Sequence, residues 1–131
     1  MREYQGRIRL VFKDRPLPGH ALARPAHEAA RCAGAKGRFW EYHDRLFEAQ
    51  PAFGRAKLLQ YAGEVGLDTT EFARCLDARR FAADVEADVK QATTLGITST
   101  PTLLVNGRRI VGEPPLEELR SIIEQALKER R

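Results

Sequence analysis

The residues best suited to covalent chemistry in this sequence are its two cysteines, Cys32 and Cys75. They lie too far apart for a C-x-x-C motif, the arrangement that couples a reactive thiolate to a neighbouring resolving thiol. One pair allows a single connectivity, which excludes a small scaffold held together by several disulfides. Each cysteine falls on the apolar side of a predicted helix, where a free thiol is commonly buried.

The three histidines are not spaced like the ligands of a metal site; they are His20, His27 and His43. Structural zinc sites take ligands in closely spaced pairs, whereas these residues are scattered singly. We therefore predict no metal site and no cofactor. His43 shares a helix face with Trp40 and Phe47 and is expected at the edge of the core, while His20 and His27 are expected on the surface.

Length and composition narrow the class of protein. A chain of 131 residues with 43% apolar and 31% charged residues is typical of one globular domain. No apolar run approaches the roughly 18 residues that span a bilayer, so membrane insertion is not expected. The net charge is +4, but the basic residues are spread singly along the chain and form no basic groove, so nucleic acid is not an expected partner.

The first predicted element is a strand over residues 7–12. Ile8, Leu10 and Phe12 share one face, and Arg7 and Arg9 lie on the other, as in a strand with one face in water.

A helical block follows this strand. Asp68 with Glu71 three residues later is typical of an N-cap, and apolar spacing marks the other helices. The first predicted helix covers about residues 21–35, and apolar stripes mark four more: Phe39 to Phe47, Leu58 to Val65, Phe72 to Leu76 after the Asp68 cap, and Phe81 to Leu95. The aromatic cluster of the second helix is interpreted as core, with a peptide groove as the alternative; its members are Phe39, Trp40, Tyr42 and Phe47.

The C-terminal third carries the clearest local pattern. Residues 102–105 and 108–111 are apolar runs joined by Asn106-Gly107, the strongest short signal for a β-hairpin with a type I′ turn. A last helix is predicted over about 115–128, with acidic residues at its start and basic residues at its end.

This order of elements resembles the DsbA-like branch of the thioredoxin-fold disulfide oxidoreductases. The segments that carry the resemblance are Val11–His20, Glu28–Ala33, Gly37–Phe47 and Leu95–Gly112, the last containing Thr98-Ser-Thr-Pro101. The resemblance implies an α/β thioredoxin-like fold with an inserted helical domain. We expect one domain over 1–131, with residues 6–13 and 97–131 as its thioredoxin part and 20–96 as the insertion, and three strands with about six helices.

The resemblance also implies a binding site. In the family, a proline equivalent to Pro101 follows a cis peptide bond, and the residue before it offers backbone groups to an extended polypeptide. Ser99, Thr100 and Pro101 are therefore the predicted substrate-binding residues, with unfolded or extended polypeptides as partners. Strand addition of this kind has little sequence preference.

The sequence departs from the family in one respect that matters for catalysis. No C-x-x-C is present, and the family's first strand and the helix that carries this motif have no counterpart, so Met1 to Gln5 resemble the tail of that helix. No catalytic residue is therefore assigned. We expect the chain as it stands to be inactive in dithiol exchange, and the alternative is a non-catalytic module for peptide binding or dimerisation. The related glutathione-dependent isomerases and transferases, which use serine at the first catalytic position, are a further alternative.

Three expectations follow from the resemblance and the missing strand. Cys32 and Cys75, placed in the helical insertion, can form a structural disulfide, remain buried thiols, or act as a redox pair. Without the family's first strand, the three predicted strands can rearrange into one sheet, the helical block alone can supply the stability, or a second copy can supply a pairing edge. We favour the last outcome, a homodimer. The family implies a periplasmic or other extracytoplasmic location, although the N-terminus has no signal-peptide pattern and the cytoplasm remains an alternative.

Overall fold

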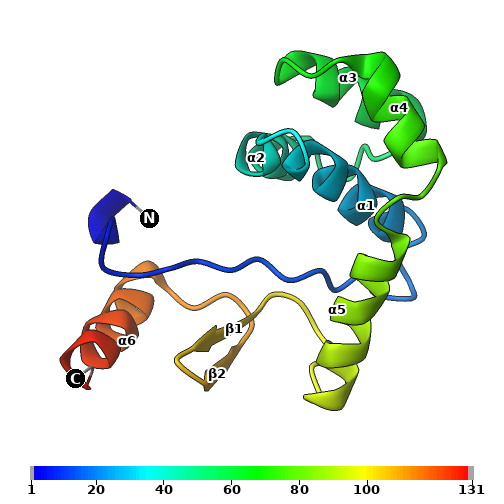
Figure 1. The fold of residues 1–131 in the computed structure, drawn as a ribbon. Helices are drawn as coiled ribbons and strands as arrows, with labels where there is room; N and C mark the ends of the chain where they lie inside the picture. Colours follow the sequence, from blue (N-terminus) through cyan, green and yellow to red (C-terminus); the bar gives the residue numbers. More distant parts are fainter. Residues whose placement is uncertain (1, 130–131) are drawn as a thin grey trace. The chain divides into compact units, whose positions relative to one another are not determined.

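The computed structural model describes residues 2–129, which form six α-helices, a short 3-10 helix and a two-stranded sheet (Figure 1). The elements are η1 (Arg2–Tyr4), α1 (Ala23–Gly34), α2 (Phe39–Ala49), α3 (Arg55–Glu64), α4 (Thr69–Asp77), α5 (Ala82–Thr94), β1 (Thr102–Val105), β2 (Arg108–Val111) and α6 (Leu116–Glu129). None of the helices in this described range is long and apolar enough to cross a membrane.

The chain divides into two compact units. The helical unit is Asp14–Gln91, and the sheet unit joins Met1–Lys13 to Ala92–Arg131. The expectation of a single folding domain stays a prediction.

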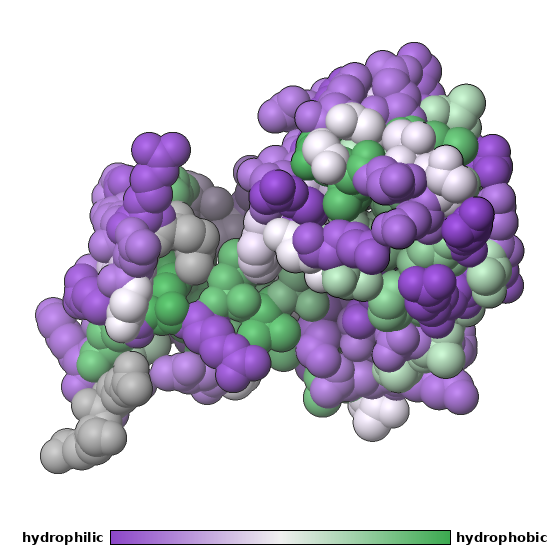
Figure 2. All heavy atoms as spheres, turned by 45° about the horizontal axis from the view of Figure 1, so that its top comes forward, coloured by the Kyte–Doolittle hydropathy of each residue, from purple (hydrophilic) through white to green (hydrophobic). Residues whose placement is uncertain are grey.

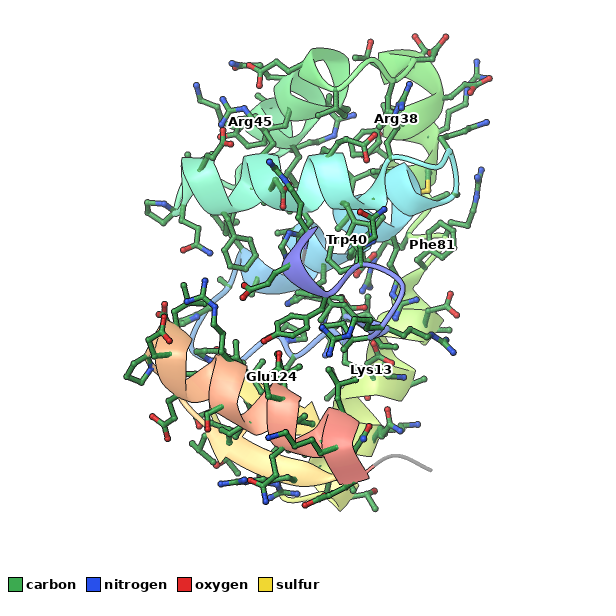
Figure 3. All side chains as sticks on the ribbon, turned by 90° about the vertical axis from the view of Figure 1, so that its left-hand side faces the viewer. Lys13, Arg38, Trp40, Arg45, Phe81 and Glu124 are labelled. Carbon is green, nitrogen blue, oxygen red and sulfur yellow. A yellow bond between two sulfur atoms is a disulfide. The ribbon has the colours of Figure 1, made fainter. Side chains whose placement is uncertain are left out.

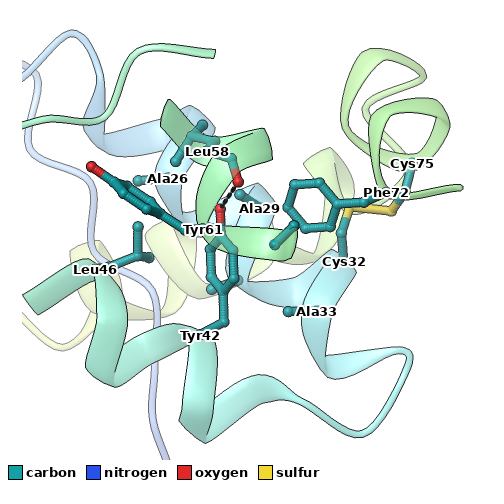
Figure 4. Close-up of a cluster of buried hydrophobic side chains, with 12 residues drawn as sticks. Ala26, Ala29, Cys32, Ala33, Tyr42, Leu46, Leu58, Tyr61, Phe72 and Cys75 are labelled. Carbon is teal, nitrogen blue, oxygen red and sulfur yellow. Dashed lines mark hydrogen bonds between the residues drawn. A yellow bond between two sulfur atoms is a disulfide. The ribbon is translucent and has the colours of Figure 1, made fainter. Parts of the chain in front are cut away.

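The helical unit contains the main hydrophobic core (Figure 4). Tyr42 and Leu58 are almost completely buried, and the Tyr42 hydroxyl donates a hydrogen bond of 2.9 Å to the Leu58 carbonyl. Tyr61 donates in the same way to the Ala52 carbonyl at 2.8 Å. Because the buried hydroxyls have partners, the two tyrosines supply apolar area without leaving a polar group unsatisfied. The core is lined by Ala26, Ala29, Ala30, Cys32, Ala33, Tyr42, Leu46, Leu58, Tyr61, Ala62, Phe72 and Cys75.

Helix α2 buries a different face from the one its aromatic spacing predicted. Tyr42 and Leu46 are its buried residues, whereas Trp40 is 41% and Phe47 is 58% exposed. Figure 3 shows Trp40 on the side of α2 that points away from α3. The interpretation of the whole aromatic cluster as core was therefore wrong for these two residues, because the face that packs on α1 and α3 repeats at Tyr42 and Leu46, one turn apart.

Helix α4 begins as the sequence predicts. Asp68 is its N-cap, and Asp68 Oδ1 accepts hydrogen bonds from the backbone N–H groups of Thr70 and Glu71 at 2.9 and 3.0 Å. These bonds satisfy two of the N–H groups that every helix leaves open at its start.

A buried charged network joins α1 and α5 to the segment that precedes α1. Asp14 is 2% exposed, and its carboxylate contacts His27 Nδ1 at 2.8 Å and accepts a hydrogen bond from Arg31 Nε at 2.5 Å. Asp88 Oδ2 accepts from Arg31 at 2.8 Å and from the Asp14 backbone N–H at 2.9 Å. The expectation that His27 is a surface residue was wrong, because its ring packs against this buried carboxylate.

The sheet unit contains the hairpin in the predicted register. The two strands are antiparallel, with Thr102 opposite Val111 and Val105 opposite Arg108. Asn106 and Gly107 have φ values of 50° and 87°, as a type I′ turn requires. Within the sheet unit, Tyr4 and Ile122 are buried. Arg120 of α6 forms an ion pair with Glu3 at 2.8 Å.

The strand predicted over residues 7–12 is absent. These residues have no helix or strand assignment, and the sheet found among residues 2–129 contains only β1 and β2. Leu10 and Val11 are about half exposed, at 50% and 54%. Alternating apolar residues form a strand only when a neighbouring strand takes their backbone hydrogen bonds, and no strand among residues 2–129 pairs with residues 7–12. The prediction of three strands is corrected to two.

Candidate functional site

The loop before β1 brings the three predicted substrate-binding residues together at the surface. Ser99, Thr100 and Pro101 are all exposed, and the Thr100–Pro101 peptide bond is cis. Two hydrogen bonds hold the loop on either side of Thr100. The Thr102 hydroxyl donates to the Ser99 carbonyl at 2.8 Å, and the Gly112 N–H donates to the Pro101 carbonyl at 2.9 Å.

The backbone of Thr100 is open between these two contacts. Within residues 2–129, neither its N–H nor its C=O forms a hydrogen bond. The loop therefore holds one residue in place while leaving its donor and acceptor free.

Strand β1 continues the same pattern along its outer edge. Pro101 is hydrogen-bonded to Gly112 opposite it, and bonded and non-bonded pairs alternate in an antiparallel ladder. Leu103 and Val105 therefore direct their backbone groups to β2, whereas Thr102 and Leu104 direct theirs away from it. We call the open backbone groups of Thr100, Thr102 and Leu104 the β1 edge.

Apolar side chains remain exposed on the hairpin. Leu104 is 48% and Val111 is 68% exposed. Figure 2 shows hydrophobic residues, coloured green, among the more numerous hydrophilic residues on the visible face. Strands with a free edge and uncovered apolar side chains are ready to accept another strand.

The two cysteines lie in the helical unit and form a disulfide. Cys32 of α1 and Cys75 of α4 have their Cα atoms 6.0 Å apart, and both residues are only 4% exposed. This rules out the alternative of two free buried thiols in this structure. The sheet unit has no cysteine in its sequence, so the β1 edge belongs to a unit without a thiol nucleophile.

Asp14, a buried acid of the helical unit whose pKa is lowered, is not among the predicted binding residues. Burial alone would raise the pKa of Asp14, but the hydrogen bonds from His27 and Arg31 outweigh burial and hold that pKa below its ordinary value. Burial raises the pKa of the Tyr42 hydroxyl, with the charge of Tyr61 adding to it. Sequence reasoning missed this network because Asp14 lies in a turn-rich segment with no periodic pattern.

The described part of the chain contains no group of side chains arranged as metal ligands. No cluster of three or more His, Cys, Asp or Glu side chains there is placed to hold a metal ion. The histidines have other roles: His27 contacts Asp14, and His43 lies against Phe47 with ring centroids 4.5 Å apart.

A hairpin after a proline loop, a C-terminal helix and an inserted helical unit define a thioredoxin-like fold of the oxidoreductase type. The crystal structure of a thioredoxin-like oxidoreductase from Silicibacter pomeroyi DSS-3 has this fold, with a TM-score of 0.80 and 26% sequence identity. The match covers 92% of this chain and 69% of that one.

Sequence comparison gives the family. The thioredoxin family profile matches residues 1–125, and the chain belongs to the thioredoxin family. It is also 40% identical over 120 residues to a protein named Na(+)/H(+) antiporter NhaA 1 from Salinispora arenicola, and 35% identical over 115 residues to the Na(+)/H(+) antiporter NhaA of Herminiimonas arsenicoxydans. These matches cover 91% and 88% of this chain, which spans 18% of the length of each of these relatives.

Proposed function

We propose that this chain is a thioredoxin-family domain that binds extended polypeptide at the β1 edge and, as it stands, does not catalyse exchange of protein disulfides. The observation that carries the proposal is the alternation of open backbone groups at Thr100, Thr102 and Leu104. An extended peptide laid beside β1 presents donors and acceptors at the same period of two residues.

The interaction is expected to be weak and tolerant of sequence. Each backbone hydrogen bond contributes about 0.5–1.5 kcal/mol net, and only three residues of the edge take part. The exposed side chain of Leu104 adds apolar contact beside the backbone pairing. Main-chain pairing supplies most of the affinity, so peptides of different sequence should compete for the same edge.

Inactivity in dithiol exchange follows from the state of the cysteines. The reaction needs a thiolate that solvent can reach, with a second thiol close by to resolve the mixed disulfide. Here both cysteines are bonded to each other and 4% exposed, and no C-x-x-C is present in the 131 residues.

An insulin-reduction assay driven by dithiothreitol tests the inactivity. We expect turnover at the uncatalysed rate, both for the chain and for a Cys32→Ser/Cys75→Ser variant. Turnover above that rate that disappears in the variant would contradict the proposal and make the pair a catalytic dithiol.

Peptide binding is tested by removing one outward donor from the edge. In Leu104→Pro the ring takes the place of the outward N–H, and Leu104→Ala is the control that shortens the side chain but keeps the donor. Loss of one hydrogen bond predicts about fivefold weaker binding of a reduced, carboxymethylated polypeptide to the proline variant than to the alanine variant, measured by fluorescence anisotropy. Equal binding by the two variants would place the polypeptide elsewhere.

A second copy of the chain is a competing occupant of the same edge. Homodimerisation through β1 is favoured by the exposure of Leu104 and Val111 on the hairpin. Sedimentation equilibrium separates the two occupants, because a dimer built on this edge dissociates when peptide is added and is weakened in Leu104→Pro.

The disulfide supports a location outside the reducing cytoplasm, since bonds of this kind persist in oxidising compartments. The names of the relatives add a candidate setting for the domain, beside a sodium–proton antiporter. Cross-linking the purified chain to membranes that contain such an antiporter would test that setting, and labelling of the antiporter that peptide suppresses is the expected result.

A further inference from the structure

A pocket in the helical unit opens over the disulfide. It has a volume of about 470 Å³ and is lined by Cys32, Cys75 and the ring of Phe72, together with charged side chains. This volume is in the range of small-molecule sites. Both cysteines line the pocket although each is only 4% exposed, so a reagent small enough to enter it is better suited to reach the bridge than a folded protein.

The pocket is positively charged. Its charged lining consists of four cationic side chains and two carboxylates, which gives a net charge of +2; these are Lys36, Arg38, Arg74, Arg80, Asp68 and Glu71.

Two of the four cationic side chains have no carboxylate partner within residues 2–129. Lys36 lies 3.2 Å from Glu71, and Arg38 lies 3.1 Å from Glu41 outside the pocket. Neither Arg74 nor Arg80 has an ion pair with any residue in the described range 2–129. Their charge is therefore available to a ligand.

The positions of these two arginines tie them to the bridge. Arg74 directly precedes Cys75, and the backbone N–H of Arg80 donates to the Cys75 carbonyl at 3.2 Å. The start of α4 does not supply the positive charge, because Asp68 already accepts from its N–H groups. Arg74 and Arg80 are thus the cationic residues of the pocket lining whose charge no carboxylate of the described range pairs with.

We infer that this pocket is a reaction site for small anionic thiols, which reduce the Cys32–Cys75 disulfide that links α1 to α4. The inference concerns the helical unit and does not depend on peptide binding at the β1 edge. It gives the bridge a redox-responsive role in addition to its structural one.

The reaction balances in two exchange steps. The thiolate of one small thiol attacks a bridge sulfur, the S–S bond breaks, and a mixed disulfide forms while the other cysteine leaves as a thiolate that takes a proton from water. A second thiolate attacks the sulfur of the bound small thiol and releases the remaining cysteine as a thiolate, which is also protonated. Two small thiols are oxidised to one disulfide, and the cysteine pair is reduced to two thiols.

A charge series of matched thiols tests the inference. 2-Mercaptoethanesulfonate, 2-mercaptoethanol and cysteamine share the same two-carbon thiol and carry a negative, neutral and positive substituent. Each rate is divided by the rate of the same thiol, at equal thiolate concentration, toward an uncharged small disulfide, because thiolates differ in intrinsic nucleophilicity. At low salt, we expect the normalised rate for the bridge of the folded chain to be about tenfold higher for the sulfonate than for cysteamine. Mass spectrometry after alkylation reports the free thiols, and 0.5 M salt, about a 4 Å screening length, should bring the rates together.

Variants locate the effect. Arg74→Gln/Arg80→Gln should reduce the sulfonate-to-cysteamine ratio to about twofold while leaving the 2-mercaptoethanol rate within about twofold of the parent. Arg9→Gln/Arg108→Gln removes two exposed arginines from the sheet unit and is the matched control, expected to keep the full ratio.

Three results would overturn the inference: equal normalised rates for the three thiols at low salt, an unchanged ratio in the pocket variant, or no reduction of the folded chain by any of them. The salt series on the unaltered chain keeps the test valid even where the pocket variant folds poorly.

Discussion

The helical unit and the sheet unit differ in how their apolar residues are buried. In the helical unit, side chains such as Leu58 and Tyr42 are enclosed by helices on several sides, and a disulfide joins two of those helices. In the sheet unit, Leu104 and Val111 of the hairpin are 48% and 68% exposed, and the other apolar side chains of the two strands are only partly buried. The comparison shows that the main hydrophobic core and the disulfide lie in the helical unit, whereas the sheet unit leaves exposed apolar side chains on its hairpin.

Removing the disulfide should lower the free energy of unfolding more than any other change proposed below, and the effect should be confined to the helical unit. Cys32→Ser/Cys75→Ser opens a bridge between residues 43 positions apart. The chain-entropy model then predicts a loss of about 4 kcal/mol in the free energy of unfolding, measured by urea denaturation. Hydrogen exchange should speed up in α1 and α4 but not in β1 and β2. Faster exchange in the hairpin with unchanged helices would reverse the comparison.

A matched pair of leucines sharpens the contrast. Leu58 is 1% exposed and Leu104 is 48% exposed. Leu58→Ala should lower the free energy of unfolding by about 3 kcal/mol, because it leaves a cavity in a packed core. Leu104→Ala should cost less than about 0.5 kcal/mol by the same urea measurement. Similar losses for both variants would show that the two units are packed alike.

The charged network of the helical unit gives a pH-dependent prediction. Asp14→Asn should cost about 2 kcal/mol near neutral pH, less than a fully buried pair because Arg31 is 29% exposed and keeps Asp88 as a partner.

The direction with pH follows from the lowered pKa of Asp14. Its contribution is fully present above the ordinary pKa of 3.8 and is lost as the pH falls through the lower value of the folded chain. The difference between parent and variant should therefore shrink below pH 3.8 in urea titrations. A difference that persists unchanged to pH 2 would mean that the carboxylate charge is not what stabilises the network.

The smallest effect is expected at the start of α4. Asp68→Ala removes the side-chain cap and should cost about 1 kcal/mol, seen as a drop of a few degrees in Tm. Glu71→Gln is the control, since its ion pair with Lys36 is exposed and such pairs contribute about 0–1 kcal/mol. A larger loss from the Glu71 variant than from the Asp68 variant would contradict the capping role.

The sequence predicted the parts of this fold that depend on local signals. The Asp68 cap, the Asn106-Gly107 turn and the spacing of the six helices each act over a few residues, and the structure has all of them. Residues 7–12 were predicted wrongly because a strand depends on a partner that local alternation does not reveal.

Only some residues of the candidate site could be predicted from the sequence. Ser99, Thr100 and Pro101 came from the resemblance to a family, and the open donors of Thr102 and Leu104 emerged only from the register of the hairpin. The pairing of Asp14 with His27 joins residues in different segments through tertiary contacts, which no sequence spacing encodes.

The most direct test of the account is residue-resolved amide exchange on the sheet unit with and without a reduced, carboxymethylated polypeptide. The account predicts that the polypeptide protects the N–H groups of Thr100, Thr102 and Leu104, while those of Leu103 and Val105, already directed to β2, change little. Protection without this alternation, or protection confined to the helical unit, would contradict the assignment of the β1 edge as the binding site.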